Sequence, residues 1–495
     1  MSIVDTIKSA WILGRQGQSV ADVQSLTAMI LRDNSSGDNQ RAKDIAARWD
    51  AYYGNSPKPL TVKRGDADDN IRLNYAGRVV DEGVSFLFGL NIDFVVEDGR
   101  DDAEDNAQGG ESDDDAPAVN LADDWLEACW GANAGMTLLS ELAINGGVAG
   151  TAFLMIAPAD PERNDHPYPR LMLVDPATIT ATWDGSDYKR ILQWVIRWTA
   201  IDPDTQKPAQ YRKLISREVN RTWTIADEVS RNDGRTWDSA GPPITWPYSW
   251  CPVFHCQNLP APNQFYGTSD LEQDVLEAGN AVNFTTSNIG RILRFHAHPK
   301  TWGRGVGAQE VPMGVDNLTL LRGENAMLQN LEMTSDLSSS LEFGKSLLRG
   351  FHAVARIPQI ATGQLENLGQ LSGLALKVLY GPLIRKNAIK QRLYGDLLQG
   401  ASQRLLELGG FAGQKVSITW PDPLPSDPVA ERQALVIDEQ LGVSQRTVLE
   451  KLGYDADAEQ TQKAKEQKDL GDTLLGQFDK GQMGSGAAGG GGQPE

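Results

Sequence analysis

The chain has 495 residues, more than a single hydrophobic core usually serves, so we expect several domains or one elongated subunit. Its 66 acidic and 46 basic residues give a formal charge of −20, which disfavours a protein that grips nucleic acid through the phosphates. The longest apolar run, residues 136–156, contains Glu141, Asn145 and three glycines, so it is not a membrane span and we expect no membrane partner.

The cysteines and the N-terminus indicate the compartment. The three cysteines, Cys129, Cys251 and Cys256, are odd in number and lack the paired spacing of zinc ligands. The N-terminus lacks the charged-then-apolar layout of a signal peptide. We therefore expect reduced cysteines in a cytoplasm, packed as small buried hydrophobic residues, with no metal site and no cofactor.

Helical patterns dominate the N-terminal part of the chain. A Ser19-x-x-Asp22 cap opens a helix over 19–32, and a second helix covers 40–53. A third helix ends at Gly89, the residue best able to turn left-handed, and residues 92–96 then alternate like a half-buried strand. The apolar face of the third helix consists of residues spaced three or four apart: Ala76, Val80, Val84 and Leu87.

The middle of the chain changes from acidic to β-rich. Between Glu97 and Asp115 there are ten acidic residues and one arginine, which predicts a solvated, disordered insertion over 98–118. Residues 121–147 have a helical pattern. Over 150–260, alternating apolar and polar residues are punctuated by prolines and by Asn-Asp-Gly and Asp-Gly-Ser turns, which predicts a module of short antiparallel strands.

The C-terminal half returns to helices. A Ser269-x-x-Glu272 capping box opens a helix over 269–295, and a second helix, about 335–355, ends before Pro358. Residues 359–371 are too rich in Gly, Gln and Asn to form core. A long helix over 372–408, kinked at Pro382, comes next. Two short helices follow at about 428–441 and 444–452, and the Gly-rich end from 484 is predicted to be disordered.

Motifs in both halves of the chain carry a family resemblance. The N-terminal motifs are Tyr52-Tyr53-Gly54, then Asn74-Tyr75 with Val79-Val80-Asp81, then Phe86-Leu87-Phe88-Gly89. The C-terminal motifs are Ser269-Asp270-Leu271-Glu272 and Ser372-Gly373-Leu374-Ala375-Leu376-Lys377, followed by Tyr380-Gly381-Pro382-Leu383. In this order they resemble bacteriophage portal proteins, the head-to-tail connectors of long-tailed phages, in the branch typical of Gram-positive hosts. The resemblance covers about residues 38–455, about 85% of the chain.

The resemblance implies an α+β fold, in which an elongated portal subunit has a helical stem, a β-containing wing, a small clip and a helical crown, and assembles as a ring. We place the N-terminal region and wing at 1–268, the two stem helices at 269–295 and 333–357, and the clip at 296–332 between them. The remaining parts are placed in chain order as a tunnel loop at 358–372, a long wing or channel helix at 373–422, a crown at 423–470 and a disordered tail at 471–495.

Three sets of site residues follow from this plan. The clip should expose Lys300 and Arg304 at its lower rim for docking of the terminase. The stem core should contain Val275, Val282, Leu341 and Leu348. The tunnel loop should meet DNA with mostly neutral side chains, which contact without gripping. Its candidate residues are Gln359, Thr362, Gln364, Glu366, Asn367 and Gln370. No catalytic residue is expected.

The resemblance also implies a function and a set of partners. About twelve copies would form a homo-oligomeric ring at one capsid vertex of the virion, after assembly in the host cytoplasm. Double-stranded DNA would pass non-specifically through the ring during packaging and ejection. The implied protein partners are the terminase large subunit, the major capsid or scaffold protein and the tail adaptor protein. An acidic channel suits this role because it repels the phosphates of moving DNA.

Two basic stretches interrupt the acidic chain. Residues 278–309 and 373–395 contain basic residues and no acidic one. Either they pair with acidic groups of a neighbouring subunit, or they face DNA or the motor. The basic residues are Arg291, Arg294, Lys300 and Arg304 in the first stretch and Lys377, Arg385, Lys386, Lys390 and Arg392 in the second.

Two other classes of function are considered, a packaging or maturation enzyme and a structural protein without a channel. A packaging nuclease–ATPase needs a phosphate-binding loop, but the nearest match, residues 339–346, has Ser339 in place of the first glycine and lies in a helical pattern. A capsid maturation protease needs a catalytic acid, His and Ser, and no such site is recognisable; Cys251 and His255 suit the start of a strand. The other alternative is a phage head structural protein, such as a minor capsid component, without a channel.

Overall fold

The computed structural model describes residues 39–64, 68–97, 121–160, 166–297, 301–304, 327–330, 337–362, 373–424 and 444–451, with a few single residues elsewhere. The predicted helix over 19–32, the acidic insertion at 98–118 and the tail at 471–495 lie outside the described residues. The chain divides into two compact units, residues 1–423 and 424–495. Helices and sheets both occur, which confirms the expected α+β class.

In the described part of the first unit, a helix over 39–52 is followed by α3 (Tyr75–Phe88) and β1 (Asp93–Glu97). Asn74 caps α3, because its side chain accepts a hydrogen bond from the amide of Gly77. The left-handed turn predicted at Gly89 is wrong: its φ is −72° and its ψ is −19°. Glycine is needed there because a Cβ would collide with the carbonyl oxygen of Ser85.

The helical region predicted over 121–147 is two helices, α4 (Leu121–Ala132) and α5 (Gly135–Ala149). The break lies at Ala134, whose φ of 63° is left-handed. The Asn133 side chain next to the break accepts from the amide of Leu171 and donates to the carbonyl of Pro169. A local polar anchor therefore ends α4 where hydrophobic periodicity alone would continue it.

The β-rich module predicted over 150–260 is confirmed as two antiparallel sheets. In the smaller sheet, β2 (Thr151–Ala157) lies between β10 (Val253–Gln257) and β3 (Arg170–Leu173). The larger sheet runs in the order β4-β5-β6-β7-β8, with β9 also pairing with β7. Its strands are β4 (Ile179–Asp184), β5 (Asp187–Ile201), β6 (Pro208–Arg217), β7 (Trp223–Ser230), β8 (Asp238–Ser239) and β9 (Ile244–Trp246).

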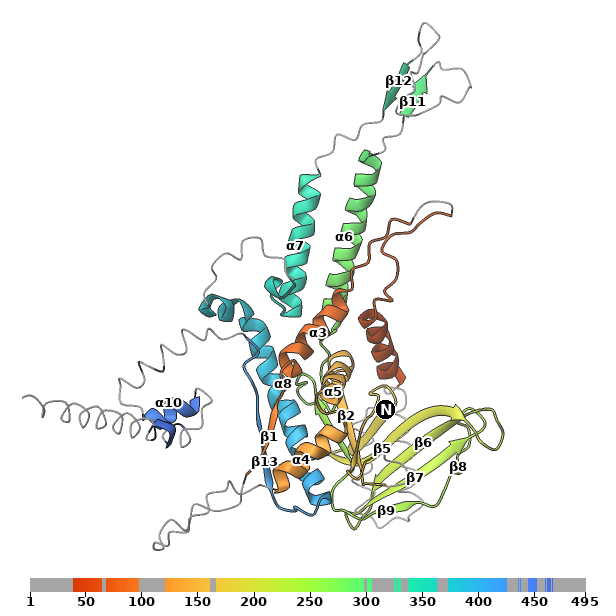
Figure 1. Ribbon diagram of the computed structural model, residues 1–495. Helices are drawn as coiled ribbons and strands as arrows, with labels where there is room; N and C mark the ends of the chain where they lie inside the picture. Colours follow the sequence, from red (N-terminus) through yellow and green to blue (C-terminus); the bar gives the residue numbers. More distant parts are fainter. Residues whose placement is uncertain are drawn as a thin grey trace, which may run out of the picture. The chain divides into compact units, whose positions relative to one another are not determined.

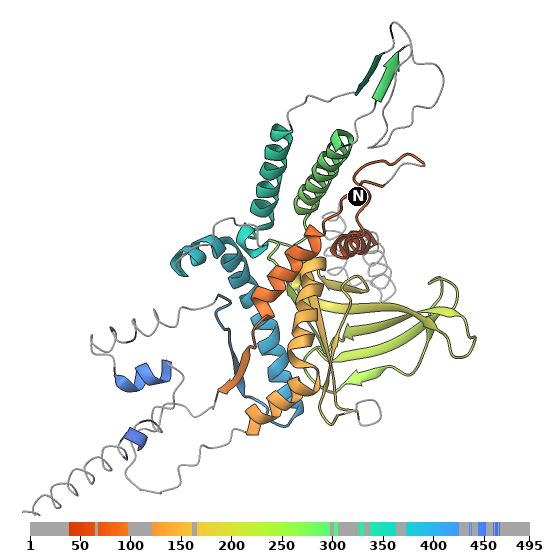
Figure 2. The same cartoon turned by 45° about the horizontal axis from the view of Figure 1, so that its top comes forward.

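Two antiparallel helices, α6 (Gln273–Ala297) and α7 (Ser338–Ala355), run side by side, and the short strands β11 (Thr301–Arg304) and β12 (Met327–Asn330) pair between them in the chain (Figure 1). A 3₁₀ turn, η1 (Gln359–Thr362), follows α7. The long helix predicted over 372–408 is α8 (Gly373–Leu408), and β13 (Lys415–Thr419) then pairs with β1. Figure 2 shows that α8 bends in its N-terminal part, which contains Pro382.

Two hydrophobic clusters hold this unit together. The larger joins α3, α4, α5, both sheets of the β-rich module and α8, and it includes Cys129 and Cys256, which are buried as predicted. Burial raises the pKa of Cys129 to about 12. Packing is tight beside Tyr394, where a Cβ on Gly146 would collide with the phenol oxygen. The smaller cluster joins α3 and α5 to the α6–α7 pair.

The second unit contains α10 (Gln445–Lys451), at the place of the helix predicted over 444–452. The Ser444 hydroxyl accepts from the amide of Thr447, as an N-cap residue does. Among the described residues of the whole chain, no helix is both long and apolar enough to cross a bilayer.

Candidate functional site

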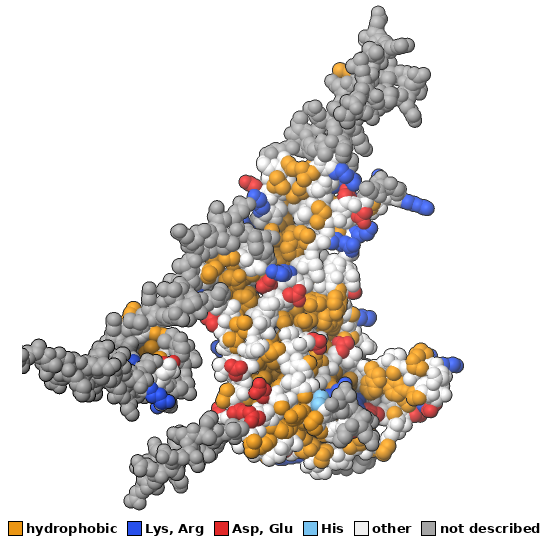
Figure 3. Space-filling view, in the orientation of Figure 1, with side chains coloured by type: hydrophobic (Ala, Val, Ile, Leu, Met, Phe, Trp, Pro, Cys, Tyr) orange, Lys and Arg blue, Asp and Glu red, His pale blue; other side chains and the backbone are white. Residues whose placement is uncertain are grey.

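The α6–α7 pair is the candidate stem, and its inner contact is close. Gly344 of α7 faces α6, since a Cβ there would lie 3.5 Å from Ile289 and 3.8 Å from Thr285. Two of the predicted core residues, Val275 and Val282, are buried in the smaller cluster, and Leu348 is half-buried against it. Leu341, by contrast, is 45% exposed in the single chain. Its place in a core stays a prediction for an assembly of several chains. Figure 3 shows hydrophobic side chains on the visible surface of the pair.

A second element braces α6 from outside. Residues 68–74, here called the strap, lie extended along the helix and meet it at three levels. Asn283 donates to the carbonyl of Leu73 (3.1 Å) and accepts from its amide (3.0 Å). Ser287 bonds the amide (2.9 Å) and carbonyl (3.1 Å) of Ile71 in the same way. Two residues of extended chain and four residues of helix both advance about 6–7 Å, so the contacts stay in step.

The third level of the strap is ionic. Arg291 donates two hydrogen bonds to Asp69 (2.8 and 2.9 Å), and Arg294 pairs with the same carboxylate at 3.1 Å. The hydrogen bonds from Arg291 hold the pKa of Asp69 below its usual value. The sequence contains a signal for this contact: the polar residues Asn283, Ser287 and Arg291 follow one another at intervals of four. This signal was missed because only the hydrophobic periodicity of α6 was considered.

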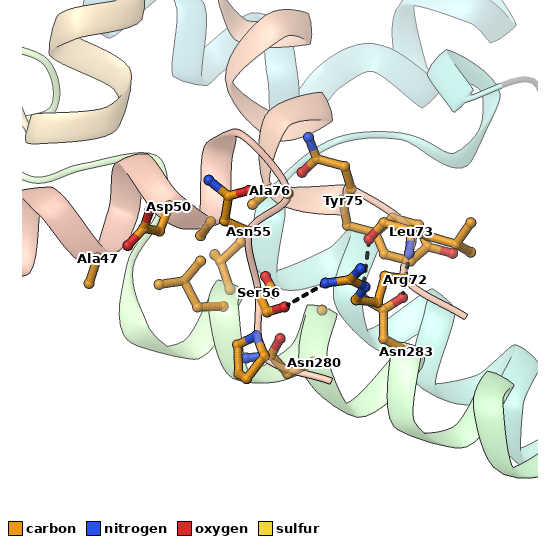
Figure 4. Close-up of a pocket in the computed structure, with 17 residues that line it drawn as sticks. Ala47, Asp50, Asn55, Ser56, Arg72, Leu73, Tyr75, Ala76, Asn280 and Asn283 are labelled. Carbon is orange, nitrogen blue, oxygen red and sulfur yellow. Dashed lines mark hydrogen bonds between the residues drawn. The ribbon is translucent and has the colours of Figure 1, made fainter. Parts of the chain in front are cut away.

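The strap, α6 and the helix over 39–52 enclose a pocket of about 300 Å³ (Figure 4). Its wall is mixed in character, with Asp50, Asn55 and Asn280 beside apolar groups. Across the pocket, the Arg72 guanidinium donates to the carbonyl of Ser56 at 3.3 Å. The pocket therefore opens at the flank of α6 that the strap follows.

The root of the stem is a buried ion cluster. Asp270, just before α6, contacts Lys386 at 2.8 Å and Lys390 at 2.5 Å, both from α8. The three side chains are 5% exposed or less. Gly147 of α5 makes room for it, because a Cβ there would lie 3.0 Å from the Asp270 carboxylate. One charged cluster thus joins α5, α6 and α8.

In this cluster, burial and the neighbouring charges shift the pKa values in opposite directions. Burial alone would raise the pKa of Asp270, but the two ammonium groups, Lys390 first, outweigh burial and lower it. Burial lowers the pKa of Lys390, and the Asp270 carboxylate offsets part of that effect. The carboxylate is therefore charged at neutral pH and serves as the counter-ion for both lysines.

The capping box predicted at Ser269 is wrong. Helix α6 begins at Gln273, and the Ser269 hydroxyl lies 2.8 and 2.7 Å from the carbonyl oxygens of Gly147 and Val148, to which it donates. The same oxygen accepts from the amide of Leu271, which is fully buried. The Ser-Asp-Leu motif is therefore a junction between the end of α5 and the start of α6, not a helix cap.

Most basic residues of the two predicted stretches pair inside the chain, contrary to both expected roles. Arg291 and Arg294 bind Asp69, Lys386 and Lys390 bind Asp270, and Lys377 lies 3.4 Å from Asp422. Acidic residues that are distant in sequence supply the partners. Arg304, Arg385 and Arg392 are exposed, and Lys300 lies outside the described residues.

Only the beginning of the predicted tunnel loop is described. Gln359 and Thr362 belong to η1, where Gln359 is half-buried, whereas Gln364, Glu366, Asn367 and Gln370 lie outside the described residues. Helix α7 ends at Ala355, and Arg356 turns left-handed with φ 58°. Arg78 of α3 donates to the carbonyl of Ala361 at 3.2 Å, which fixes the start of the loop against the stem root.

The residues considered for catalysis have other surroundings. Residues 339–346 lie within α7, so they form helix and not the loop that cradles phosphate in a P-loop. Burial raises the pKa of Cys251 to about 12 and lowers the pKa of His255 to about 4, so both are uncharged at neutral pH. Among the described residues, no three His, Cys, Asp or Glu side chains gather as metal ligands would.

The comparison with protein families agrees with the sequence motifs. Residues 280–471, from the middle of α6 through α7 and α8, match the family described as "Phage portal protein, SPP1 Gp6-like". This match confirms the resemblance to phage portal proteins, a structural family, over that part of the chain. No curated protein matches the sequence.

The structure is distantly similar to solved structures of gene transfer agent particles. One is "Virion of native gene transfer agent (GTA) particle", 14% identical, with 83% of this chain and 94% of that chain covered and a TM-score of 0.44. Another is "Neck of empty GTA particle computed with C6 symmetry", 14% identical, with 77% and 90% covered and a TM-score of 0.44. A third is "Neck of native GTA particle computed with C12 symmetry", 13% identical, with 77% and 89% covered and a TM-score of 0.44.

Replacing Asp270 by Asn should destabilise the chain by about 3–5 kcal/mol, because two buried ammonium groups would lose their counter-ion. Asp422→Asn is the matched control: it removes the exposed pair that Asp422, which follows β13, makes with Lys377 of α8, and it should cost less than about 1 kcal/mol. Urea unfolding of the two variants measures both values.

The wild-type protein and the Asp270→Asn variant also give a test by pH. Since the folded pKa of Asp270 lies below the unfolded value of about 3.9, its stabilisation is complete above that pH and is lost as the pH falls through the folded value. The gap between wild type and Asp270→Asn should therefore narrow on acidification below about pH 4. A gap that stays constant there would contradict the assigned counter-ion role.

Proposed function

We propose that this protein is a phage portal protein, which forms a ring-shaped channel at one capsid vertex for packaging and ejection of double-stranded DNA. One observation carries the proposal. An antiparallel helix pair, connected through a small β-hairpin and rooted on a long bent helix, lies in the segment that matches the portal family. In this reading α6 and α7 are the stem, β11 and β12 belong to the clip, and α8 is the channel helix.

The charge distribution supports passage of DNA without grip. The chain is strongly acidic, and five basic residues of the stem and α8 already have carboxylate partners within the chain. A channel wall built from such chains would release few counterions on meeting phosphates, so bound DNA would not be held. The partners of the ring would be the terminase large subunit, the major capsid or scaffold protein and the tail adaptor protein.

The ring is tested by negative-stain electron microscopy and native mass spectrometry of the purified protein. We expect rings of about twelve subunits with a central hole. Closed shells would instead favour a head structural protein without a channel. A chain that stays monomeric at all concentrations would contradict the proposed function.

The clip is proposed as the motor-docking surface, through Lys300 and the exposed Arg304 of β11. Changing both residues to Glu should leave rings intact and weaken binding of the terminase large subunit by about tenfold or more, because complementary charges guide such encounters. Surface plasmon resonance with immobilised rings measures the affinity, and Arg392→Glu, an exposed arginine of α8, is the control. Unchanged binding by the double variant would make the basic clip inert toward the motor.

The segment between η1 and α8 is proposed as the tunnel loop that touches DNA. Its two ends are attached to folded elements, η1 at Ala361 and the start of α8 at Gly373. Deleting residues 363–369 should still give rings and empty heads, whereas the yield of DNA-filled heads should fall sharply. Sedimentation of heads from cells that express the deletion separates the two. Filled heads at the wild-type yield would make this segment a simple connector.

A further inference from the structure

The two flanks of the stem pair differ in a way that a ring can use. On α6, Val282, Thr285 and Ile289 turn toward α7, and Asn283, Ser287 and Arg291 turn toward the strap. Each residue advances about 100° around a helix, which leaves one uncovered arc of α6. That arc carries Asp274, Glu277 and Phe284, all of which are exposed.

The flanks of α7 are equally distinct. Leu341, Lys345 and Arg349 follow one another at intervals of four on one flank of α7. Since the two helices are right-handed and antiparallel, this flank lies on the same side of the pair as Gly290 of α6, where a Cβ would lie 3.2 Å from Ile71 of the strap. Phe343 and Val354 lie on the opposite flank, with Gly350 open between them. Because α7 runs antiparallel to α6, this second flank is continuous with the Phe284 arc.

The stem therefore has two faces. We call the first the strap face, with the apolar side chains Ile71, Leu73 and Leu341 and the basic side chains Arg72, Lys345 and Arg349. The second is the Phe284 face, with the apolar side chains Phe284, Phe343 and Val354 and the acidic side chains Asp274 and Glu277. Figure 3 looks onto the strap face, where hydrophobic and basic side chains lie side by side over α6 and α7.

Both faces carry large apolar side chains that are exposed to solvent in the single chain. Phe284 is 48% exposed, Phe343 is 59% exposed and Leu73 is 45% exposed. Large apolar groups gathered on one surface and bordered by charge mark protein contacts. Within the described residues, neither Lys345 and Arg349 on one face nor Asp274 and Glu277 on the other form an ion pair.

We propose that the Phe284 face of one copy docks on the strap face of the next copy, and that this single repeated contact closes the ring. This inference rests on the proposed function and names its assembly contact. A cyclic ring needs two different faces that complement each other on every subunit. The opposite charges and shared apolar character of the two faces meet that requirement, and two identical faces in contact would place like charges together.

The levels of the contacts along α6 also agree. Leu73 is held at the level of Asn283, next to Phe284, and Ile71 is held at the level of Ser287. Phe284 would therefore meet Leu73 and the guanidinium of Arg72 at the rim of the pocket in the next copy, a favourable setting for an aromatic ring. Phe343, next to Gly344 at the level of Thr285 and Ile289, would meet Ile71 and Leu341.

This contact gives the strap a second role. The backbone amides and carbonyls of Ile71 and Leu73 are bonded to Ser287 and Asn283, so the side chains of these two residues are presented on a fixed support. The strap lies outside the residues that match the portal family, 280–471, yet it supplies Ile71 and Leu73, two of the three apolar groups on its face. The N-terminal region would thus be part of the ring wall.

Two variants that each block one face test the proposal. Phe284→Asp blocks the Phe284 face, and Leu73→Asp blocks the strap face without removing its backbone hydrogen bonds. Each variant alone should stay monomeric, because every contact needs both faces. A 1:1 mixture retains one intact pair of faces, so it should form heterodimers and stop there. Native mass spectrometry and mass photometry count the subunits.

Controls separate folding and function from the interface. Val219→Asp places the same charge on a fully exposed residue outside the stem and should form rings as wild type does. Circular dichroism melting checks that all variants fold. Glu277→Lys and Arg349→Glu should each reduce ring yield, and the double exchange should restore it, a result that a merely structural defect would not give.

The outcomes are distinct. Rings at the wild-type yield from Phe284→Asp or Leu73→Asp, rings from their mixture, or a mixture that stays monomeric at ten times the wild-type assembly concentration would overturn the proposed contact. In each of these cases a wild-type ring with a central hole would leave the proposed function standing. A wild type without rings would overturn both.

Discussion

The buried carboxylate of Asp270 is the constraint on which the stem depends. Two ammonium groups from α8 converge on it in a place with almost no water, where each unpaired charge would cost several kcal/mol. Such a cluster tolerates only one arrangement of the helices that contribute to it. The start of α6, the end of α5 and the middle of α8 are therefore fixed together, and the direction of the stem follows from that junction.

Small residues make this junction possible. Gly147 leaves room for the carboxylate, because a Cβ there would lie 3.0 Å from it. Ser269 completes the site by donating to the carbonyls of Gly147 and Val148 at the end of α5, and the Gly147 carbonyl also accepts from the amide of Asp270. A buried ion pair of this kind contributes less to stability than to choosing one geometry, and a channel assembled from repeated subunits requires one geometry.

Much of the fold was predictable from the sequence, because helices and strands each have a characteristic local periodicity of apolar residues. The spacing of apolar residues predicted α3, α7 and α8, and alternation with turn signals predicted the β-rich module. The junction was not predictable, since Asp270 and its lysines are more than a hundred residues apart and a Ser-x-x-Glu pattern imitates a helix cap. One signal was present: Lys386 and Lys390 fall between Leu383 and Tyr394 on the buried stripe of α8, where lysines need a partner.

The strap was hidden for a different reason. Its contacts with α6 are polar and combine a period of two in the strap with a period of four in the helix, so neither segment shows a hydrophobic pattern for them. Leu341 illustrates the converse, because its apolar periodicity marks a surface that one chain leaves exposed. Patterns within a sequence report burial in the final assembly, whereas a single subunit buries only the part that it can cover itself.

Most basic residues of the stem and of α8 are also engaged in contacts with protein. Arg291, Arg294 and Lys386 are neutralised by carboxylates of their own chain, so the basic residues of α6 and α8 leave little positive charge for phosphates. Among the described residues of the stem, Lys345 and Arg349 form no ion pair, and both lie on the strap face beside apolar groups. In the proposed ring the next subunit covers that face and brings Glu277. DNA in the channel would then meet a wall whose cations are already engaged, and it would slide where a basic wall would hold it.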